Sequence, residues 1–271
     1  MFKSSHYKNK IAFVIGASEG IGKSVAKGLL TNGANVVILS RSAQKLEAAR
    51  SELEREKTGR DQTLVARTID VRDFTQTRAT LGSLISQFGV PDFVVNTAGF
   101  ARPGYLTDLD IEHIREMMEL NYFGTVHVCK AVLPELLKAK RGHIVNTSSI
   151  AGFIGLFGYT GYSASKFAVV GFSEALKREV APLGVKVSVL CPPNTKTPGL
   201  ENENKHKPAE VLATEEKVKV VDPDYVANDL LKALPKNKFL IIPTLDGTLA
   251  HRLNRFLPGL LEQFVKRPFS S

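Results

Sequence analysis

Short apolar runs rich in β-branched residues recur along the chain and alternate with longer segments of helical periodicity. Several of the runs are apolar on both faces, which is typical of parallel strands covered by helices on each side. The repeated strand–helix order predicts an α/β fold, a doubly wound (Rossmann) parallel sheet of about seven strands with right-handed crossovers. We predict strands over 11–16, 35–40, 63–70, 92–96, 142–148, 185–190 and 238–243, and helices over 20–32, 43–57, 73–88, 110–119, 123–139 and 161–181.

Neither an internal repeat nor a compositional break divides the 271 residues, so we expect one catalytic domain over residues 1–271. One segment departs from the strand–helix rhythm, because residues 193–221 are polar, contain proline and lack a clear core face. Long segments of this kind inside compact domains are usually functional lids or disordered. We therefore predict a substrate lid at 193–221.

An amphipathic helical tail is expected at about 247–268. Its apolar stripe is bordered by basic residues, and such a stripe can lie in a membrane interface. Packing on the same domain or on a partner subunit is more common and is favoured here, with peripheral membrane contact as the alternative. Pro258 is expected to interrupt the helix. The stripe comprises Leu249, Leu253, Phe256, Leu257, Leu260, Leu261, Phe264 and Val265.

The formal charge of +9 is compatible with nucleic acid, anionic lipid or a phosphorylated ligand. The basic residues are scattered without interleaved aromatics, so we expect no nucleic acid partner. Cys129 and Cys191 belong to no metal-ligand pattern; we predict two buried cysteines in a reducing compartment and no metal site. With no signal-peptide pattern or membrane-spanning apolar run, a cytoplasmic enzyme is predicted, with a peripheral position at a membrane surface as the alternative.

Three glycines follow the first predicted strand in the sequence VIGASEGIG. Glycine permits positive φ and lets the backbone approach a bound group closely, while the following helix N-terminus offers unpaired N–H groups. In this strand–turn–helix context the pattern favours a dinucleotide pyrophosphate site over a purely structural turn. The residues predicted to contact the cofactor here are Gly16, Ser18, Glu19, Gly20, Ile21 and Gly22.

The end of the second predicted strand indicates which dinucleotide is bound. In NAD-binding sheets an acidic residue there holds the ribose 2′-hydroxyl. This chain instead has Ser40, Arg41 and Lys45, with no acid before Glu47. Because a guanidinium forms forked contacts with phosphate, we predict that NADPH/NADP is preferred. The alternative is that Arg41 is simply an exposed residue at a helix start.

Tyr162 and Lys166 lie one helical turn apart and should share a face. A neighbouring ammonium lowers the pKa of a phenol, which is about 10 when unperturbed. We therefore expect Tyr162 to protonate a carbonyl oxygen as hydride arrives, and Ser149 to donate a second hydrogen bond to that oxygen. Either feature alone would more often be a surface pair or a helix cap.

Five motifs together resemble the short-chain dehydrogenase/reductase family: GASEGIG, NTAG (96–99), LNYFG (120–124), the SS ending at Ser149, and YSASK (162–166). The resemblance covers residues 9 to 243 and implies the doubly wound fold and a homodimer or homotetramer formed through helices at 110–139 and 161–181. It implies the catalytic residues Asn121, Ser149, Tyr162 and Lys166, with Asn121 holding a water in a proton relay to Lys166. It also implies cofactor contacts by Asp70 and Val71 at the adenine, and by Asn96, Ala98, Gly99, Tyr162, Lys166, Pro192 and Thr195.

The segment between Ser149 and Tyr162 is unusually apolar and offers the main indication of the substrate. An apolar lining suits a long hydrocarbon and a lipid-like ketone, although helix packing accounts for some of these positions. Phe153, Phe157 and Tyr159 are the predicted contacts in this segment.

A narrower resemblance, carried by GLFGYTGYSASKFAVVGFSEAL and PPNTKTPGLENENKHKP, is to the 3-ketodihydrosphingosine reductase group. It implies NADPH-dependent reduction of a 3-keto group in a C18-like amino lipid. An ammonium beside that ketone would favour an acidic contact, for which Glu201 and Glu203 are candidates, although solvated lid charges are the commoner explanation. The alternatives are reduction of a 3-oxoacyl thioester, a steroid or a small ketone, and NADPH binding without turnover.

Overall fold

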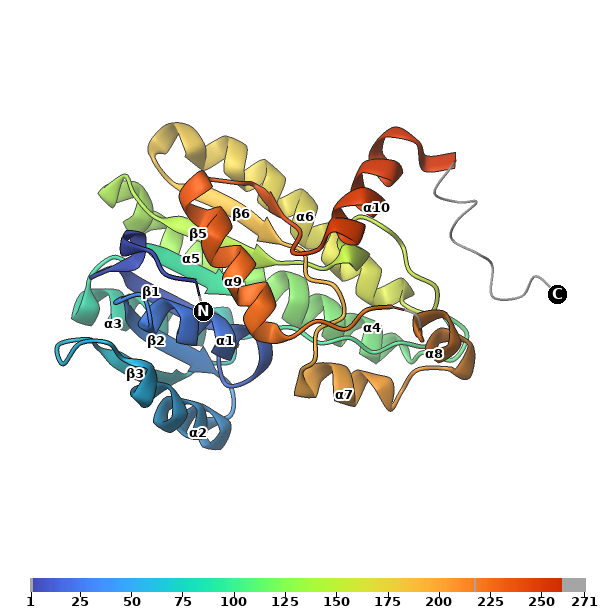
Figure 1. The fold of residues 1–271 in the computed structure, drawn as a ribbon, viewed down its shortest axis with the longest axis horizontal. Coiled ribbons are helices and arrows are strands. Elements are labelled where there is room, and N and C mark those ends of the chain that lie inside the picture. Colours follow the sequence, from blue (N-terminus) through green and yellow to red (C-terminus); the bar gives the residue numbers. More distant parts are fainter. Residues whose placement is uncertain (1, 217, 260–271) are drawn as a thin grey trace.

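In the computed structural model, which describes residues 2–216 and 218–259, the predicted strands form one parallel sheet (Figure 1). The strand order is β3-β2-β1-β4-β5-β6-β7, so the doubly wound α/β fold is confirmed. The strands are β1 (Ile11–Ile15), β2 (Asn35–Ser40), β3 (Leu64–Thr68), β4 (Phe93–Asn96), β5 (His143–Thr147), β6 (Lys186–Leu190) and β7 (Leu240–Ile241).

Each of the six predicted helices is present. They are α1 (Gly20–Leu30), α2 (Ala43–Leu53), α3 (Phe74–Phe88), α4 (Ile111–Met117), α5 (Gly124–Ala139) and α6 (Thr160–Val180). The predicted 43–57 segment is divided, because a short 3-10 turn, Glu54–Glu56, follows α2. Three further helices among the described residues were not predicted individually: α7 (Pro198–Asn204), α8 (Ala209–Glu215) and α9 (Pro223–Ala233). Helix α10 (Leu245–Phe256) lies at the start of the predicted amphipathic tail.

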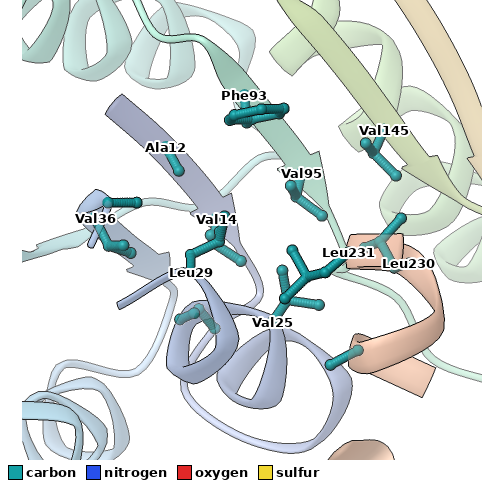
Figure 2. Packing of buried hydrophobic residues seen from close by; sticks show 14 of the residues in the cluster. Ala12, Val14, Val25, Leu29, Val36, Phe93, Val95, Val145, Leu230 and Leu231 are labelled. Carbon is teal, nitrogen blue, oxygen red and sulfur yellow. The ribbon is translucent and has the colours of Figure 1, made fainter. Parts of the chain in front are cut away.

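The alternation of side chains along the strands divides the core between two faces of the sheet. On one face, Val14 and Val95 pack with Val25 and Leu29 of α1 and with Leu230 of α9 (Figure 2). On the other face, the alternate strand residues pack against α3, α5 and α6. This cluster includes Phe13, Val37, Val94, Leu81, Val132 and Leu176. Because both faces are covered, the strands are apolar throughout, as their sequences predict.

Strand β1 lies between β2 and β4, with Val14 paired to Ile38 on one side and to Val95 on the other. The chain therefore winds outward from β1 to β3, and then returns across the sheet to β4. The carboxyl ends of β1 and β4 flank this change of direction, which in doubly wound sheets is the place where ligands bind.

The segment predicted as a lid contains two short helices, α7 and α8, which lie together at one end of the molecule in Figure 1. Thr197 caps α7 by accepting a hydrogen bond from the backbone N–H of Leu200. A β-bridge between Thr195 and Val221 joins the two ends of the segment. Two apolar side chains anchor the segment, since Val211 on α8 is fully buried and Val221 joins the core.

The amphipathic tail begins as helix α10, which ends at Phe256 before Pro258. Asn254 donates a hydrogen bond to the backbone carbonyl of Phe153, and the His251 ring lies 4.9 Å from the Phe153 ring. Leu249 and Phe256 are 58% and 72% exposed, so these two residues do not pack on their own domain, and their packing on a partner subunit or at a membrane surface stays a prediction. The predicted tail residues 260–268 lie outside the described residues.

None of the helices within residues 2–216 and 218–259 combines the length and the apolar character needed to span a bilayer.

Candidate active site

A cavity of about 1070 Å³ lies at the carboxyl ends of the strands, between the glycine turn and the lid helices. It brings together residues predicted from widely separated parts of the sequence. The predicted residues that line it are Gly16, Ser18, Glu19, Gly20, Ile21, Gly22, Ser40, Arg41, Lys45, Asp70, Val71, Ala98, Gly99, Ser149, Phe157, Tyr159, Tyr162, Lys166, Pro192, Thr195 and Glu203.

The glycine turn leaves no room for side chains on the backbone that faces the cavity. Gly16 and Gly20 have φ of +82° and +56°, where side-chain-bearing residues are strained. A Cβ on Gly22 would lie 2.4 Å from the carbonyl oxygen of Gly16. Helix α1 begins directly after this turn, and Glu19 at its N-cap makes no side-chain capping bond. The turn therefore fits the pyrophosphate of a dinucleotide, which would accept the free N–H groups of α1.

The far end of the cavity has a basic rim after β2. Arg41 and Lys45 both line it, and Lys45 forms a 2.8 Å ion pair with Glu19. Within the described residues, no carboxylate lies within ion-pair distance of Arg41, which leaves its guanidinium available to a phosphate. Asp70, at the end of the next strand, is itself paired with Arg72, and this pairing lowers the pKa of its carboxyl group.

Tyr162, Lys166 and Ser149 all line this cavity. Lys166 Nζ lies 5.6 Å from the centre of the Tyr162 ring and donates a 3.0 Å hydrogen bond to the backbone carbonyl of Thr147. Ser149 lies near the Tyr162 hydroxyl, where it lowers the pKa of the phenol, and the Ser149 hydroxyl accepts a hydrogen bond from the N–H of Ala151. The phenol and the serine hydroxyl are therefore placed to hold one carbonyl oxygen between them.

The expected lowering of the Tyr162 pKa is wrong for the protein alone. Burial raises the pKa of the phenol, and the nearby Glu203 carboxylate raises it further, while the Ser149 hydrogen bond lowers it. The Lys166 ammonium, which donates to the Thr147 carbonyl and lies 5.6 Å from the ring centre, does not outweigh this effect of burial. Burial also lowers the pKa of Lys166 to about 8. Tyr162 is therefore held as a neutral phenol, the form that can donate a proton.

Asn121 lies behind the cavity wall rather than in it. It is fully buried within a π-helical turn, Met118–Phe123, between α4 and α5. Its side-chain amide donates to the Phe100 carbonyl and to Ser165, and its oxygen accepts from the Phe100 N–H. π-turns often occur at functional sites, and a Cβ added to Gly99 would lie 2.8 Å from this oxygen and 3.2 Å from Lys166 Nζ. The side chain thus lies close to the lysine that it was predicted to serve.

Three other predicted contacts do not line the cavity. Asn96 is buried beneath it and donates a 2.8 Å hydrogen bond to Asn146. Phe153 instead lies against the His251 ring of α10, in a buried cluster with Val189 and Cys191. Glu201 is exposed on the outer side of α7, two residues from Glu203, which lines the cavity. The helical period explains this difference, since residues two apart lie on opposite sides of a helix.

Several residues at the site were not predicted. Leu200 and Val218 line the cavity and give its substrate side an apolar wall, together with Leu156 and Phe157 of the apolar segment that the sequence indicated. Glu215 lines it from α8, and Lys207 lies behind with a side chain only 1% exposed. The spacing of Glu203 and Lys207 was a usable signal for an ion pair, but the contact of Glu215 with Lys207 depends on how α7 and α8 fold together.

Comparison with known proteins places these features in a family. The sequence profile of the short chain dehydrogenases matches residues 10–208. The chain belongs to the short-chain dehydrogenase family. As a member of this family it is an oxidoreductase acting on ketone or alcohol groups with a nicotinamide dinucleotide cofactor.

The chain is also similar to named members of the family. It is 37% identical over 227 residues to the 3-dehydrosphinganine reductase of Danio rerio, covering 83% of this chain and 68% of that protein. It is 34% identical over 254 residues to the 3-ketodihydrosphingosine reductase of Dictyostelium discoideum, covering 88% of this chain and 76% of that protein.

Solved structures of the family share the fold. A short chain dehydrogenase/reductase from Burkholderia phymatum in complex with NAD superposes with a TM-score of 0.82 at 22% identity, covering 100% of this chain and 99% of that one. Levodione reductase gives a TM-score of 0.79 at 22% identity, covering 87% and 96% of the two chains.

Proposed function

We propose that the protein reduces the 3-keto group of 3-ketodihydrosphingosine to a hydroxyl, with NADPH as the hydride donor. The observation that carries the proposal is the meeting of Tyr162, Ser149 and Lys166 at one end of a cavity whose other wall is apolar. The similarity to the reductases of Danio rerio and Dictyostelium discoideum supports the substrate. Reduction of another ketone by the same residues is the second candidate.

In this reaction Tyr162 donates its proton to the carbonyl oxygen. A nicotinamide dinucleotide held by the glycine turn and Arg41 would supply the hydride that the carbonyl carbon receives. Burial keeps the phenol protonated until the developing alkoxide takes the proton, and Ser149 donates a hydrogen bond to the same oxygen. Lys166 stabilises the resulting phenolate by its positive charge, from 5.6 Å above the ring.

The lid and the segment before α6 would contact the two ends of such a substrate with different side chains. Leu156, Phe157 and Leu200 provide apolar surface for the hydrocarbon chain. Glu203 lines the cavity, so the amine next to the ketone would lie close to a carboxyl group that can form a hydrogen bond with it. Glu201 is not included in this proposal because it is exposed outside the cavity.

The preference for NADPH rests on Arg41. Its guanidinium and the Lys45 ammonium border the part of the cavity next to Ser40, where a 2′-phosphate would lie. An opposing acid, which would repel that phosphate, is absent from the described end of β2.

Self-association through α4, α5 and α6 stays a prediction. Phe123 and Phe167, on the π-turn and on α6, are 40% and 44% exposed, which leaves apolar surface on the predicted faces. Light scattering after size exclusion would give the number of subunits, and a monomer at all concentrations would contradict the prediction.

The deciding experiment measures NADPH oxidation with synthetic 3-ketodihydrosphingosine beside 3-oxoacyl thioesters, steroids and small ketones. We expect the highest kcat/KM with 3-ketodihydrosphingosine, and product analysis should show dihydrosphingosine. Higher kcat/KM with one of the other ketones would reassign the substrate. Binding of NADPH without turnover of any ketone would contradict the enzymatic proposal itself.

A further inference from the structure

A buried network of polar side chains joins both lid helices to the start of α6. The hydroxyl oxygen of Tyr159, which precedes α6, lies 2.6 Å from Glu203 Oε1 on α7 and 2.8 Å from Glu215 Oε1 on α8. Lys207 Nζ lies 2.6 Å from Glu215 Oε2 and 3.3 Å from Glu203 Oε1. The Lys207 side chain is 1% exposed and the two carboxylates 16% and 18%, so little solvent screens these groups.

If both glutamates were ionised, one of the two short contacts of Tyr159 would have no proton to form a hydrogen bond. A phenol carries one proton and can donate it to only one acceptor in a well-formed hydrogen bond. The Tyr159 oxygen nevertheless lies within 2.8 Å of two carboxyl oxygens. Both contacts are satisfied if one carboxyl group is protonated, because that group then donates to the Tyr159 oxygen while Tyr159 donates to the other.

The surroundings differ for the two carboxyl groups. Glu215 Oε2 accepts from Lys207 at 2.6 Å and from Asn194 Nδ2 at 3.0 Å, so two other donors stabilise its charge. Apart from Tyr159, the one donor to Glu203 among the described residues is Lys207, at the longer distance of 3.3 Å. Burial raises the pKa of the Glu203 carboxyl group, and Glu215 adds to this, against the opposing effects of Tyr159 and Lys207. Glu203 is therefore the group better suited to keep a proton.

We propose that Glu203 keeps its proton while the lid is closed, and that Tyr159 is a positioning residue that fastens both lid helices to the catalytic helix. Tyr159 and Tyr162 are three residues apart with ring centres separated by 6.0 Å, so the lid is linked to the position of the catalytic phenol. This link to catalysis rests on the proposed function. The fastening of the lid does not, because it involves no substrate.

Hydrogen exchange of the α8 backbone amides tests the role of Tyr159. In Tyr159→Phe the two carboxyl groups lose their shared phenol, and we expect α8 amides to exchange about tenfold faster, with exchange in the central strands unchanged. Tyr105→Phe is the matched control, because the Tyr105 hydroxyl also binds a glutamate of α8, Glu210, but at the exposed surface. Equal exchange rates in the wild type and Tyr159→Phe would overturn the fastening role.

The location of the proton is tested with two isosteric variants. Glu203→Gln imitates a neutral carboxyl group and should preserve the protection of α8, whereas Glu215→Gln leaves Lys207 without its closest anion and should reduce protection about tenfold. An infrared band of a protonated carboxyl group should be present in the wild type at neutral pH and absent in Glu203→Gln. If the band persists in Glu203→Gln, or if the two variants lose protection equally, the assignment of the proton is wrong.

A proton on Glu203 also predicts that the protection of the α8 amides from hydrogen exchange depends on pH. Glu203 is faced by Tyr159 and Tyr162 from α6, by Lys207 after α7 and by Glu215 from α8. Loss of its proton at high pH would place two carboxylates against one phenol, so α8 protection, corrected for intrinsic exchange, should fall with rising pH. Glu203→Gln should remove this fall. If the wild type reduces ketones but its α8 protection does not change with pH, the inference is wrong and the proposed function is unaffected.

Discussion

At the scale of single residues, the spacing of Tyr162 and Lys166 was sufficient to predict that they lie together. Their charge states were not predictable, because these depend on burial that no local pattern reveals. The structure reverses the expected effect, so Tyr162 is held as a phenol and the pKa of Lys166 is lowered to about 8. This arrangement favours proton donation, as reduction requires.

Replacing Tyr162 with Phe removes the proton donor while keeping the ring. We expect kcat for ketone reduction to fall by about 10² to 10⁴-fold, the usual contribution of a general acid. NADPH affinity, measured by fluorescence titration, should change little because the glycine turn and Arg41 are untouched. Retained turnover would show that another group supplies the proton.

Arg41 is the residue on which cofactor selectivity depends. In Arg41→Asp the forked contact with phosphate is replaced by repulsion, and we expect the ratio of kcat/KM for NADPH over NADH to fall by about 100-fold. Arg60→Asp, at an exposed position in the turn before β3, makes the same charge change away from the cavity and should leave the ratio unchanged. An unaltered preference in Arg41→Asp would place the selectivity elsewhere.

At the scale of elements, the glycine turn and the lid are in contact. A Cβ on Gly20 would lie 2.9 Å from Thr197 Cγ2, at the cap of α7. The sequence showed a glycine turn and a polar lid, but nothing in either segment indicated that they meet. Their contact depends on the path of the chain from β6 back across the cavity.

Gly20→Ala tests this contact. The added methyl group at φ of +56° strains the turn and displaces Thr197, so we expect NADPH affinity to fall about tenfold, measured by titration. Gly82→Ala is the control, because a Cβ on Gly82 in α3 has no neighbour within 4 Å. That control should leave NADPH affinity unchanged and stabilise the helix by about 0.5–1 kcal/mol. Equal affinities in the two variants would show that the turn tolerates the side chain.

At the scale of the whole molecule, the candidate active site lies at the carboxyl ends of the strands, and a buried titratable group lies at their amino ends. His143 begins β5 and is 4% exposed, with Nε2 2.7 Å from the Ser188 hydroxyl. Burial, with a smaller effect of Lys186, lowers the pKa of His143 to about 4. The folded protein therefore favours the neutral imidazole, whereas the unfolded chain binds a proton below about pH 6.5.

Stability should consequently fall as the pH falls from about 6.5 to about 4. In that range the unfolded state binds more protons at His143 than the folded state, and the loss amounts to about 3 kcal/mol at the lower limit. Urea unfolding of the wild type and of His143→Gln between pH 7 and pH 4 measures it. The variant should show a shallower decline in the free energy of unfolding, and parallel declines would mean that other groups titrate.

The sequence by itself determined the strand and helix order, the glycine turn, and the residues of the Tyr162–Lys166 motif, because these follow from local periodicity and short spacing. It also identified Arg41, since its place at the end of a strand is a local property. Only the tertiary structure decided that Glu203 and not Glu201 lines the cavity, that Phe153 is directed to α10, and that Lys207 is buried with Glu215. Each of these depends on which segments meet across the sheet, and the resulting burial sets protonation states that a linear pattern cannot encode.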